Sequence, residues 1–168
     1  MHKVSIIPRG VAALGYTLQL STQEKFLSTE QELKDQIAIL MGGRVAEEIV
    51  FKDISSGASN DLERASEIAR EMVTRLGMSK TLGPLTYGKR QQLMYLGTQV
   101  PEEKNYSEET ARRIDSEVKS LIDEGYQRAA QMLTEKRHLL DNLASRLEKK
   151  EVLSGEEVNA VIKRNQSS

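Results

Sequence analysis

The sequence contains no cysteine and no tryptophan, and aromatic side chains make up only 4% of its 168 residues. The absence of cysteine excludes a disulfide framework and leaves only His, Asp and Glu as strong metal ligands. A nucleic-acid surface needs stacking platforms or an excess of positive charge, and this chain has few aromatics and a net charge of −1. We therefore expect no nucleic acid among its partners.

Two longer patterns are also missing from the sequence. No apolar run reaches the roughly 18 residues that a membrane-spanning helix needs, so we expect no membrane contact by this chain itself. The phosphate-binding motif G-x-x-x-x-G-K-[ST] does not occur, so we expect any ATP and magnesium to be bound outside these 168 residues. A length of 168 residues, 38% of them hydrophobic, suits one ordinary core, and we predict a single domain spanning residues 1–168.

What is present is mostly helical periodicity, which predicts a mainly α fold with a small β element. We expect a strand pair and two helices in residues 1–78, a loop in 79–106, further helices in 107–164 and a disordered tail in 165–168. The first helix has two possible caps, Ser28 with Gln31 or Thr29 with Glu32, and Ser154 with Glu157 is expected to cap the last one. The predicted loop includes a short extended piece near residues 82–87.

The most informative pattern is a double glycine inside the first predicted helix, followed by a glycine- and serine-rich turn. Gly42 and Gly43 cost the helix roughly 2 kcal/mol relative to alanine, which is tolerated where another backbone approaches closely. The turn ends in a second helix start, with Ser59 or Asn60 as the expected cap and Asp61 in the first turn. The pattern indicates a site that holds an acidic side chain at a fixed helix entry.

The residues around these two patterns resemble the peptidase domain of the FtsH-type, membrane-anchored, ATP-dependent zinc metalloproteases. The matching segments run in order through nearly the whole chain: His2 to Gly10, Leu14 to Thr17, Gly42 to Glu48, Gly57 to Ala65, Gly77 to Ser79, Leu82 to Pro84, and Glu109 to Asp115. The resemblance implies a helical zinc-metallopeptidase domain. Its zinc motif, His-Glu-x-x-His, would lie shortly upstream of His2, and it does not occur in these 168 residues. We therefore expect an N-terminally truncated domain.

The resemblance also assigns roles to individual residues. Asp61 matches the third zinc ligand of the family, whereas the general base would lie in the missing motif, so no catalytic residue is expected in this chain. Glu47 or Glu48 would support the metal site, and Gly42 and Gly43 would provide packing space, although two glutamates on a helix are equally typical of a solvated face. An extended segment is a possible edge for binding substrate by strand addition, or an ordinary strand: Gly15, Tyr16, Thr17, Leu18, Gln19 and Leu20.

For the parent protein, the resemblance implies zinc, unfolded or membrane protein substrates, a homohexamer, and a membrane anchor with the peptidase domain on the cytoplasmic side or its organellar equivalent. For this chain alone we expect no stoichiometric zinc and no proteolysis, because two ligands and the general base are absent. The alternative is a non-catalytic scaffold or oligomerisation module derived from the same domain. Loss of the zinc-binding helix would uncover apolar residues, so we expect either an oligomer or helices repositioned to cover them, chiefly Leu40, Met41, Val45, Leu62, Ala65 and Ala69.

Overall fold

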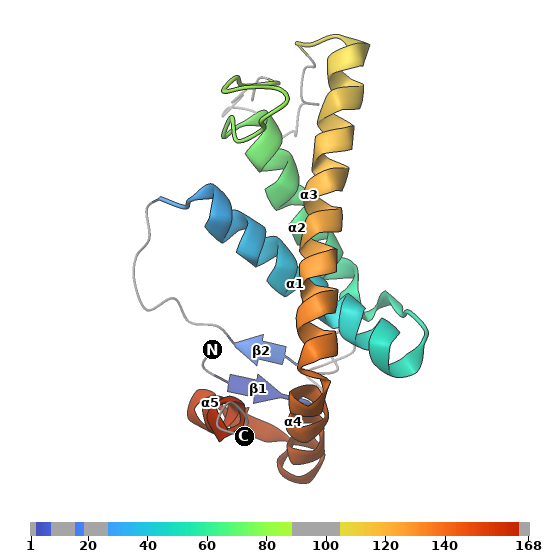
Figure 1. The fold of residues 1–168 in the computed structure, drawn as a ribbon, viewed down its shortest axis with the longest axis vertical. Coiled ribbons are helices and arrows are strands. Elements are labelled where there is room, and N and C mark those ends of the chain that lie inside the picture. Colours follow the sequence, from blue (N-terminus) through green and yellow to red (C-terminus); the bar gives the residue numbers. More distant parts are fainter. Residues whose placement is uncertain (1–2, 8–15, 19–26, 89–104, 165–168) are drawn as a thin grey trace, which may run out of the picture. The chain divides into compact units, whose positions relative to one another are not determined.

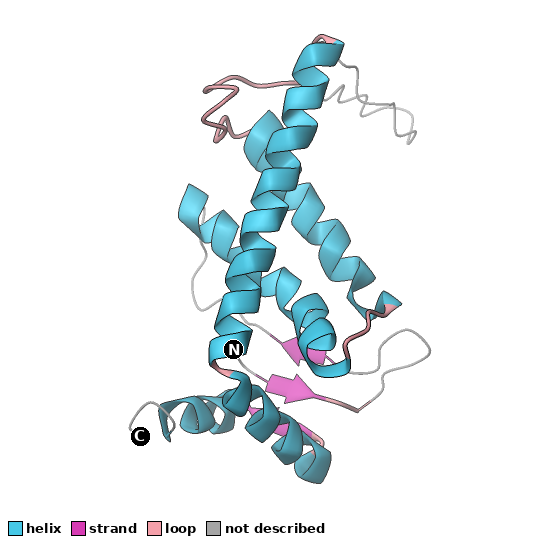
Figure 2. Ribbon diagram, turned by 45° about the vertical axis from the view of Figure 1, so that its right-hand side comes forward, coloured by secondary structure: helices cyan, strands magenta, loops and turns pink. Residues whose placement is uncertain are grey.

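The computed structural model describes residues 3–7, 16–18, 27–88 and 105–164 (Figure 1). These residues form helices and a small sheet (Figure 2), so the predicted mainly α fold is confirmed. The chain divides into two compact units, one made of residues 27–132 and the other of residues 1–26 with 133–168. The expected single domain stays a prediction.

The larger unit contains α1 (Glu30–Phe51), α2 (Ser59–Thr74) and all but the end of α3 (Glu108–Glu135). Each helix contributes a stripe of apolar side chains at helical spacing to one core. The buried members are Ile37, Met41 and Val45 of α1, Ala65, Ala69, Met72 and Val73 of α2, and Ile114, Val118 and Ala129 of α3. Met41, Val45, Ala65 and Ala69 are therefore covered, because the three helices bury them against one another.

Helix α1 begins at a capping box and ends at a left-handed residue. Thr29 accepts a hydrogen bond from the backbone N–H of Glu32, whose carboxylate accepts one from the N–H of Thr29, so the second of the two predicted caps is confirmed. Lys52 ends the helix with a φ of 58°. That conformation turns the chain away from the helix axis toward α2.

Helix α3 crosses α1 (Figure 1). At Gly125 of α3 the backbone comes close to Ile37 of α1. A Cβ atom at Gly125 would lie 2.6 Å from Ile37 Cγ2 and 3.3 Å from the backbone nitrogen of Ala38, so only glycine fits this approach. Lys34 forms an ion pair with Glu124 at 3.2 Å, and Asp35 pairs with Arg128. These exposed pairs contribute little energy, and the crossing depends mainly on the close backbone approach.

The smaller unit is a three-stranded sheet with two helices. Strand β1 (Lys3–Ser5) lies between β2 (Tyr16–Leu18) and β3 (Val152–Ser154), and both pairings are antiparallel. The helices are α4 (Arg137–Lys150) and α5 (Gly155–Arg164), close to their expected positions. Ser154 and Glu157 form the predicted capping box of α5. The third strand was not predicted from the sequence.

The segment after α2 differs from the predicted extended piece. Residues 79 and 83 form an isolated β-bridge that closes a turn, and no strand occurs in the described part of the loop. Gly77 and Gly83 both have positive φ, and a Cβ atom at Gly77 would lie 3.1 Å from the Cα atom of Pro84. The glycines and the proline fold the chain into a turn before a strand can form. The predictions for residues 89–104 and 165–168 lie outside the described residues.

Candidate functional site

The connection from α1 to α2 carries the predicted site. After Lys52, residues Ser56–Ala58 form a 3₁₀ turn that leads without a break into α2 at Ser59. Ser55 caps this turn, since its hydroxyl oxygen accepts a 3.0 Å hydrogen bond from the N–H of Gly57. The predicted caps Ser59 and Asn60 are therefore wrong: Ala58 is the N-cap of α2 and offers no side-chain hydrogen bond. The 3₁₀ turn places both polar residues inside the helix.

Asp61 lies in the first turn of α2, as the sequence predicted, and its side chain is half-buried. Among the residues that the structure describes, its carboxylate has no hydrogen-bond or ion-pair partner. The partial positive charge of a helix N-terminus favours a negative group at this position. Asp61 thus presents its carboxylate at the start of α2 without a partner among the described residues.

Glu47 of α1 binds the connection directly. Its Oε2 atom accepts a 3.0 Å hydrogen bond from the N–H of Ser55, and its Oε1 atom accepts a 2.7 Å bond from the Ser55 hydroxyl. These two bonds, assisted by the nearby Arg44 guanidinium, lower the pKa of the Glu47 carboxyl below its usual range. Arg44 also donates a 3.4 Å hydrogen bond to the carbonyl oxygen of Ser55.

Glu48, the next residue, has a different partner. Its carboxylate accepts a hydrogen bond from the hydroxyl of Tyr126 on α3. This bond, together with burial, raises the pKa of the Tyr126 hydroxyl. The two adjacent glutamates thus have different structural roles. Glu47 holds the connection that leads to Asp61, and Glu48 joins α1 to α3.

Sequence reasoning missed Ser55 and Arg44. The only signal for Ser55 was a serine two residues before a glycine, a spacing that suits a side-chain cap at a turn. Arg44 gave no separate signal, since its contact depends on the left-handed turn at Lys52. Tyr126 was missed for a similar reason, because its partner is on a helix far away in the sequence.

The double glycine of α1 faces open space in the described structure. A Cβ atom built on Gly42 or Gly43 would have no atom within 4 Å. No described residue therefore makes the close approach that the two glycines predict. Their role as packing space for another helix stays a prediction.

Within the described residues, no three His, Asp or Glu side chains cluster closely enough to hold a metal ion. His138, on α4, is exposed, and His2 lies outside the described residues. Asp61 has the chemistry of a zinc ligand and no partner among the described residues. It fits a zinc site only as one member of a larger ligand set.

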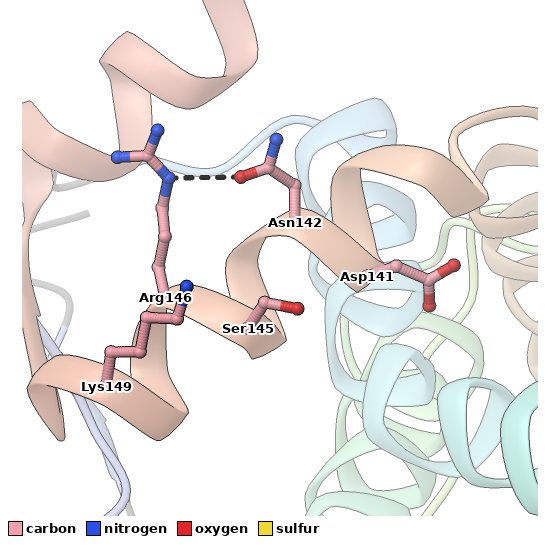
Figure 3. Close-up of a pocket in the computed structure, with 5 residues that line it drawn as sticks. All are labelled: Asp141, Asn142, Ser145, Arg146 and Lys149. Atoms are coloured by element: carbon pink, nitrogen blue, oxygen red, sulfur yellow. Dashed lines mark hydrogen bonds between the residues drawn. The ribbon is translucent and has the colours of Figure 1, made fainter.

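A surface hollow of about 550 Å³ lies on α4, away in sequence from these residues (Figure 3). Its lining consists of Asp141, Asn142, Ser145, Arg146 and Lys149. The Arg146 guanidinium donates a 3.0 Å hydrogen bond to the Asn142 side chain across one turn of the helix. All five lining side chains are polar and come from one helix, and none belongs to the predicted site.

The predicted substrate edge lies partly within the described residues. Strand β2 (Tyr16–Leu18) pairs with β1 on one side and is an edge strand of the described sheet. An edge position leaves backbone groups available for an added strand. Gly15, Gln19 and Leu20 lie outside the described residues, and substrate binding at this edge stays a prediction.

Comparison with known proteins decides the family. The sequence model of peptidase family M41 matches residues 1–161. The chain belongs to this family. The M41 chain is 69% identical over 163 residues to the ATP-dependent zinc metalloprotease FtsH of Methylococcus capsulatus, covering 97% of this chain and 26% of that protein.

Proteins with the same name from two other bacteria are also similar to this M41 chain. The one from Pseudothermotoga lettingae is 50% identical over 163 residues, which cover 97% of this chain and 26% of that protein. The one from Thermotoga maritima is 49% identical over 162 residues, which cover 96% of this chain and 27% of that protein. The chain thus spans about a quarter of the length of these relatives. No helix in the described ranges has the length and apolar character to cross a bilayer.

Proposed function

We propose that this chain forms part of the proteolytic domain of an ATP-dependent zinc metalloendopeptidase, and that Asp61 is one of its zinc ligands. The observation that carries the proposal is the Asp61 carboxylate, which is half-buried, oriented by the first turn of α2 and without a partner among the described residues. A carboxylate that served only as a cap would accept a hydrogen bond from a backbone N–H at the helix start. Membership of peptidase family M41 supports the same role.

The chain's own residues supply one ligand and its support. Asp61 would bind the metal through a carboxylate oxygen, and α2 would fix the direction of that oxygen. Zinc, when bound, supplies Lewis-acid activation of water and of the scissile carbonyl. The remaining ligands and the general base would come from a His-Glu-x-x-His helix, and the space beside Gly42 and Gly43 suits a closely packed helix.

The wider activity is proposed for the whole protein. Its relatives are named ATP-dependent zinc metalloproteases, and we propose that an ATPase ring of the same hexameric, membrane-anchored protein delivers unfolded or membrane proteins to this domain. The free edge of β2 supports a role in holding such a substrate as an added strand. The peptidase domain would lie on the cytoplasmic side of the membrane.

The test is the exchange of Asp61 for Asn in the full-length protein. We expect proteolysis of an unfolded casein-type substrate to fall more than about 100-fold, with loss of bound zinc and with unchanged ATPase activity. Glu63→Gln, an exposed position on the same helix, is the matched control and should retain zinc. If Asp61→Asn retains both zinc and proteolysis, Asp61 is not a ligand. The scaffold alternative then becomes the better account of this part of the chain.

The 168-residue chain by itself provides a second test. One carboxylate cannot retain catalytic zinc, so metal analysis after dialysis should find none bound stoichiometrically, and a digestion assay should detect no cleavage. One zinc per chain together with chelator-sensitive cleavage would show that these residues contain a complete site.

A further inference from the structure

No side-chain cap at the start of α2 holds the helix in position. Its N-cap, Ala58, makes no side-chain hydrogen bond, and the preceding 3₁₀ turn is capped by Ser55 instead. The turn and the helix are continuous, since the N–H of Ser59 bonds to the carbonyl of Ser56 within the same run. The location of Ser55 therefore sets the location of every residue in the first turn of α2, including Asp61.

Two side chains on one face of α1 bind both the backbone and the hydroxyl of Ser55. Glu47 accepts hydrogen bonds from both its N–H and its hydroxyl, at 3.0 and 2.7 Å, and Arg44 donates to its carbonyl oxygen at 3.4 Å. The Ser55 hydroxyl then accepts the 3.0 Å bond from the N–H of Gly57. All three hydrogen-bonding groups of Ser55 are thus occupied. Arg44 and Glu47 are three residues apart, so they lie on the same side of the helix.

Gly57 leaves the space that this arrangement needs. A Cβ atom there would lie 3.2 Å from the Ser55 hydroxyl oxygen and 3.3 Å from Oε1 of Glu47. The buried methyl group of Ala58 also helps to anchor the turn. A methyl contact is non-directional, however, whereas the charged hydrogen bonds to Ser55 define both position and orientation.

We propose that Arg44 and Glu47 are positioning residues that act through Ser55 to place the Asp61 carboxylate for metal binding. We call these three residues the Ser55 clamp. The inference rests on the proposed function, in which Asp61 binds zinc. The clamp touches neither metal nor substrate, and its effect passes through the backbone from Ser55 to α2. Loss of the clamp leaves Asp61 in the chain, but its carboxylate is no longer held in one position and direction.

The test uses the full-length protein and two readouts besides proteolysis. Zinc retention is measured as the rate of zinc loss to a chelator, and the order of the turn is measured as amide hydrogen exchange over residues 55–62. Glu47→Gln removes one of the two carboxylate acceptors, and Ser55→Ala removes the hydroxyl. We expect both variants to lose zinc about 10-fold faster and to exchange faster over residues 55–62. Ser55→Thr restores the hydroxyl in an extended residue that accommodates threonine, and it should behave like the unmodified protein.

Asp53→Asn is the matched control, because it changes a carboxylate in the same connection whose one hydrogen bond within the described residues is from the N–H of Ile54. It should change neither readout. If Glu47→Gln and Ser55→Ala exchange faster but keep zinc as the unmodified protein does, the clamp is only structural and the proposal is wrong. Unchanged exchange would also overturn it. Asp61→Ala separates the two proposals: zinc loss in that variant without zinc loss in the clamp variants refutes only the clamp. Zinc retention in Asp61→Ala refutes the ligand assignment and the clamp with it.

Discussion

At each end of α2, a carboxylate from a neighbouring helix holds a turn through a serine hydroxyl. Before the helix, Glu47 of α1 binds Ser55, whose hydroxyl accepts from the N–H of Gly57. After the helix, Glu117 of α3 accepts a 2.9 Å hydrogen bond from the Ser79 hydroxyl, which accepts a 3.0 Å bond from the N–H of Leu82. The same three-part connection thus occurs twice within one unit.

The two turns differ in burial and in what they leave unbonded. Ser79 is 6% exposed, and Glu117 also accepts a 2.6 Å bond from Thr81, so the second turn is closed and its polar groups are paired. Ser55 is exposed, and the helix that follows it carries Asp61, which has no partner among residues 3–7, 16–18, 27–88 and 105–164. Polar groups that are buried and paired stabilise a fold, whereas an oriented and accessible carboxylate is available for chemistry. The comparison separates a closed, paired end of α2 from the end at which we propose the metal ligand.

The largest expected effect on stability comes from a glycine in the closed part of the unit. Gly125→Ala would place a Cβ atom 2.6 Å from Ile37 Cγ2, within the closed part of the unit. Overpacking of this kind should lower the free energy of unfolding by about 2–3 kcal/mol, measured by denaturant unfolding. An unchanged midpoint would mean that α3 shifts freely over α1, and the closed part would then be less rigid than the comparison requires.

Glu117→Ala should have the next largest effect. It leaves the hydroxyl of the buried Ser79 without its acceptor, which should cost about 2 kcal/mol of unfolding free energy. Glu117→Gln, which keeps one acceptor oxygen, should cost less. Glu47→Ala should destabilise the chain less than Glu117→Ala, because water can replace its bonds to the exposed Ser55. Equal losses in Glu47→Ala and Glu117→Ala would remove the distinction between the two turns.

Gly43→Ala should have a smaller effect of opposite sign. No atom lies within 4 Å of the added methyl group, so in the 168-residue chain alanine should stabilise α1 by about 0.5–1 kcal/mol. In the full-length protein, Gly42→Leu or Gly43→Leu should impair zinc binding, because the larger side chain fills the space that we propose for the ligand helix. Equal destabilisation by these leucine variants in both proteins would assign the glycines to an internal contact instead.

The smallest effect is a pH dependence at Glu47. Hydrogen bonds from Ser55 lower the pKa of this carboxyl in the folded state, so the stabilisation is fully present above the unfolded value of about 4.3. It is lost as the pH falls through the lowered folded pKa. The stability difference between the unmodified chain and Glu47→Gln should therefore be larger at pH 7 than at pH 3. In a Ser55→Ala background this pH dependence should shrink, since the main hydrogen bond is gone.

Helices and their caps were largely predictable from the sequence, because both signals are local. The capping boxes at Thr29 and Ser154 lie within four residues, and the buried stripes follow the helical period. Strand β3 was missed because three residues are too few to show an alternating pattern. The predicted cap of α2 was wrong, because a capped 3₁₀ turn and a capped α-helix begin with the same kinds of residue.

The site was predictable only in part. Asp61 and the glutamate pair carry a local signal, which is acidic residues at a helix start and beside a double glycine. The hydrogen bonds between Ser55 and Glu47 depend on the left-handed conformation of Lys52, which brings these two residues, eight positions apart, into contact. Lysine has no preference for that conformation, so no sequence pattern marks it. Contacts that depend on such a turn become visible only in three dimensions.

The sheet of the smaller unit has a consequence for the order in which the chain folds. Val4 pairs with Leu153, so β1 cannot gain its second neighbour until the chain has been synthesised as far as β3. The contacts within residues 27–132 span much shorter loops, and loops of that kind close faster and at lower entropic cost. The helical unit can thus fold on the ribosome while β1 and β2 form at most a marginal hairpin. During this interval β1 has an unpaired edge, which exposes the β1–β2 hairpin to wrong strand pairing and to chaperone binding.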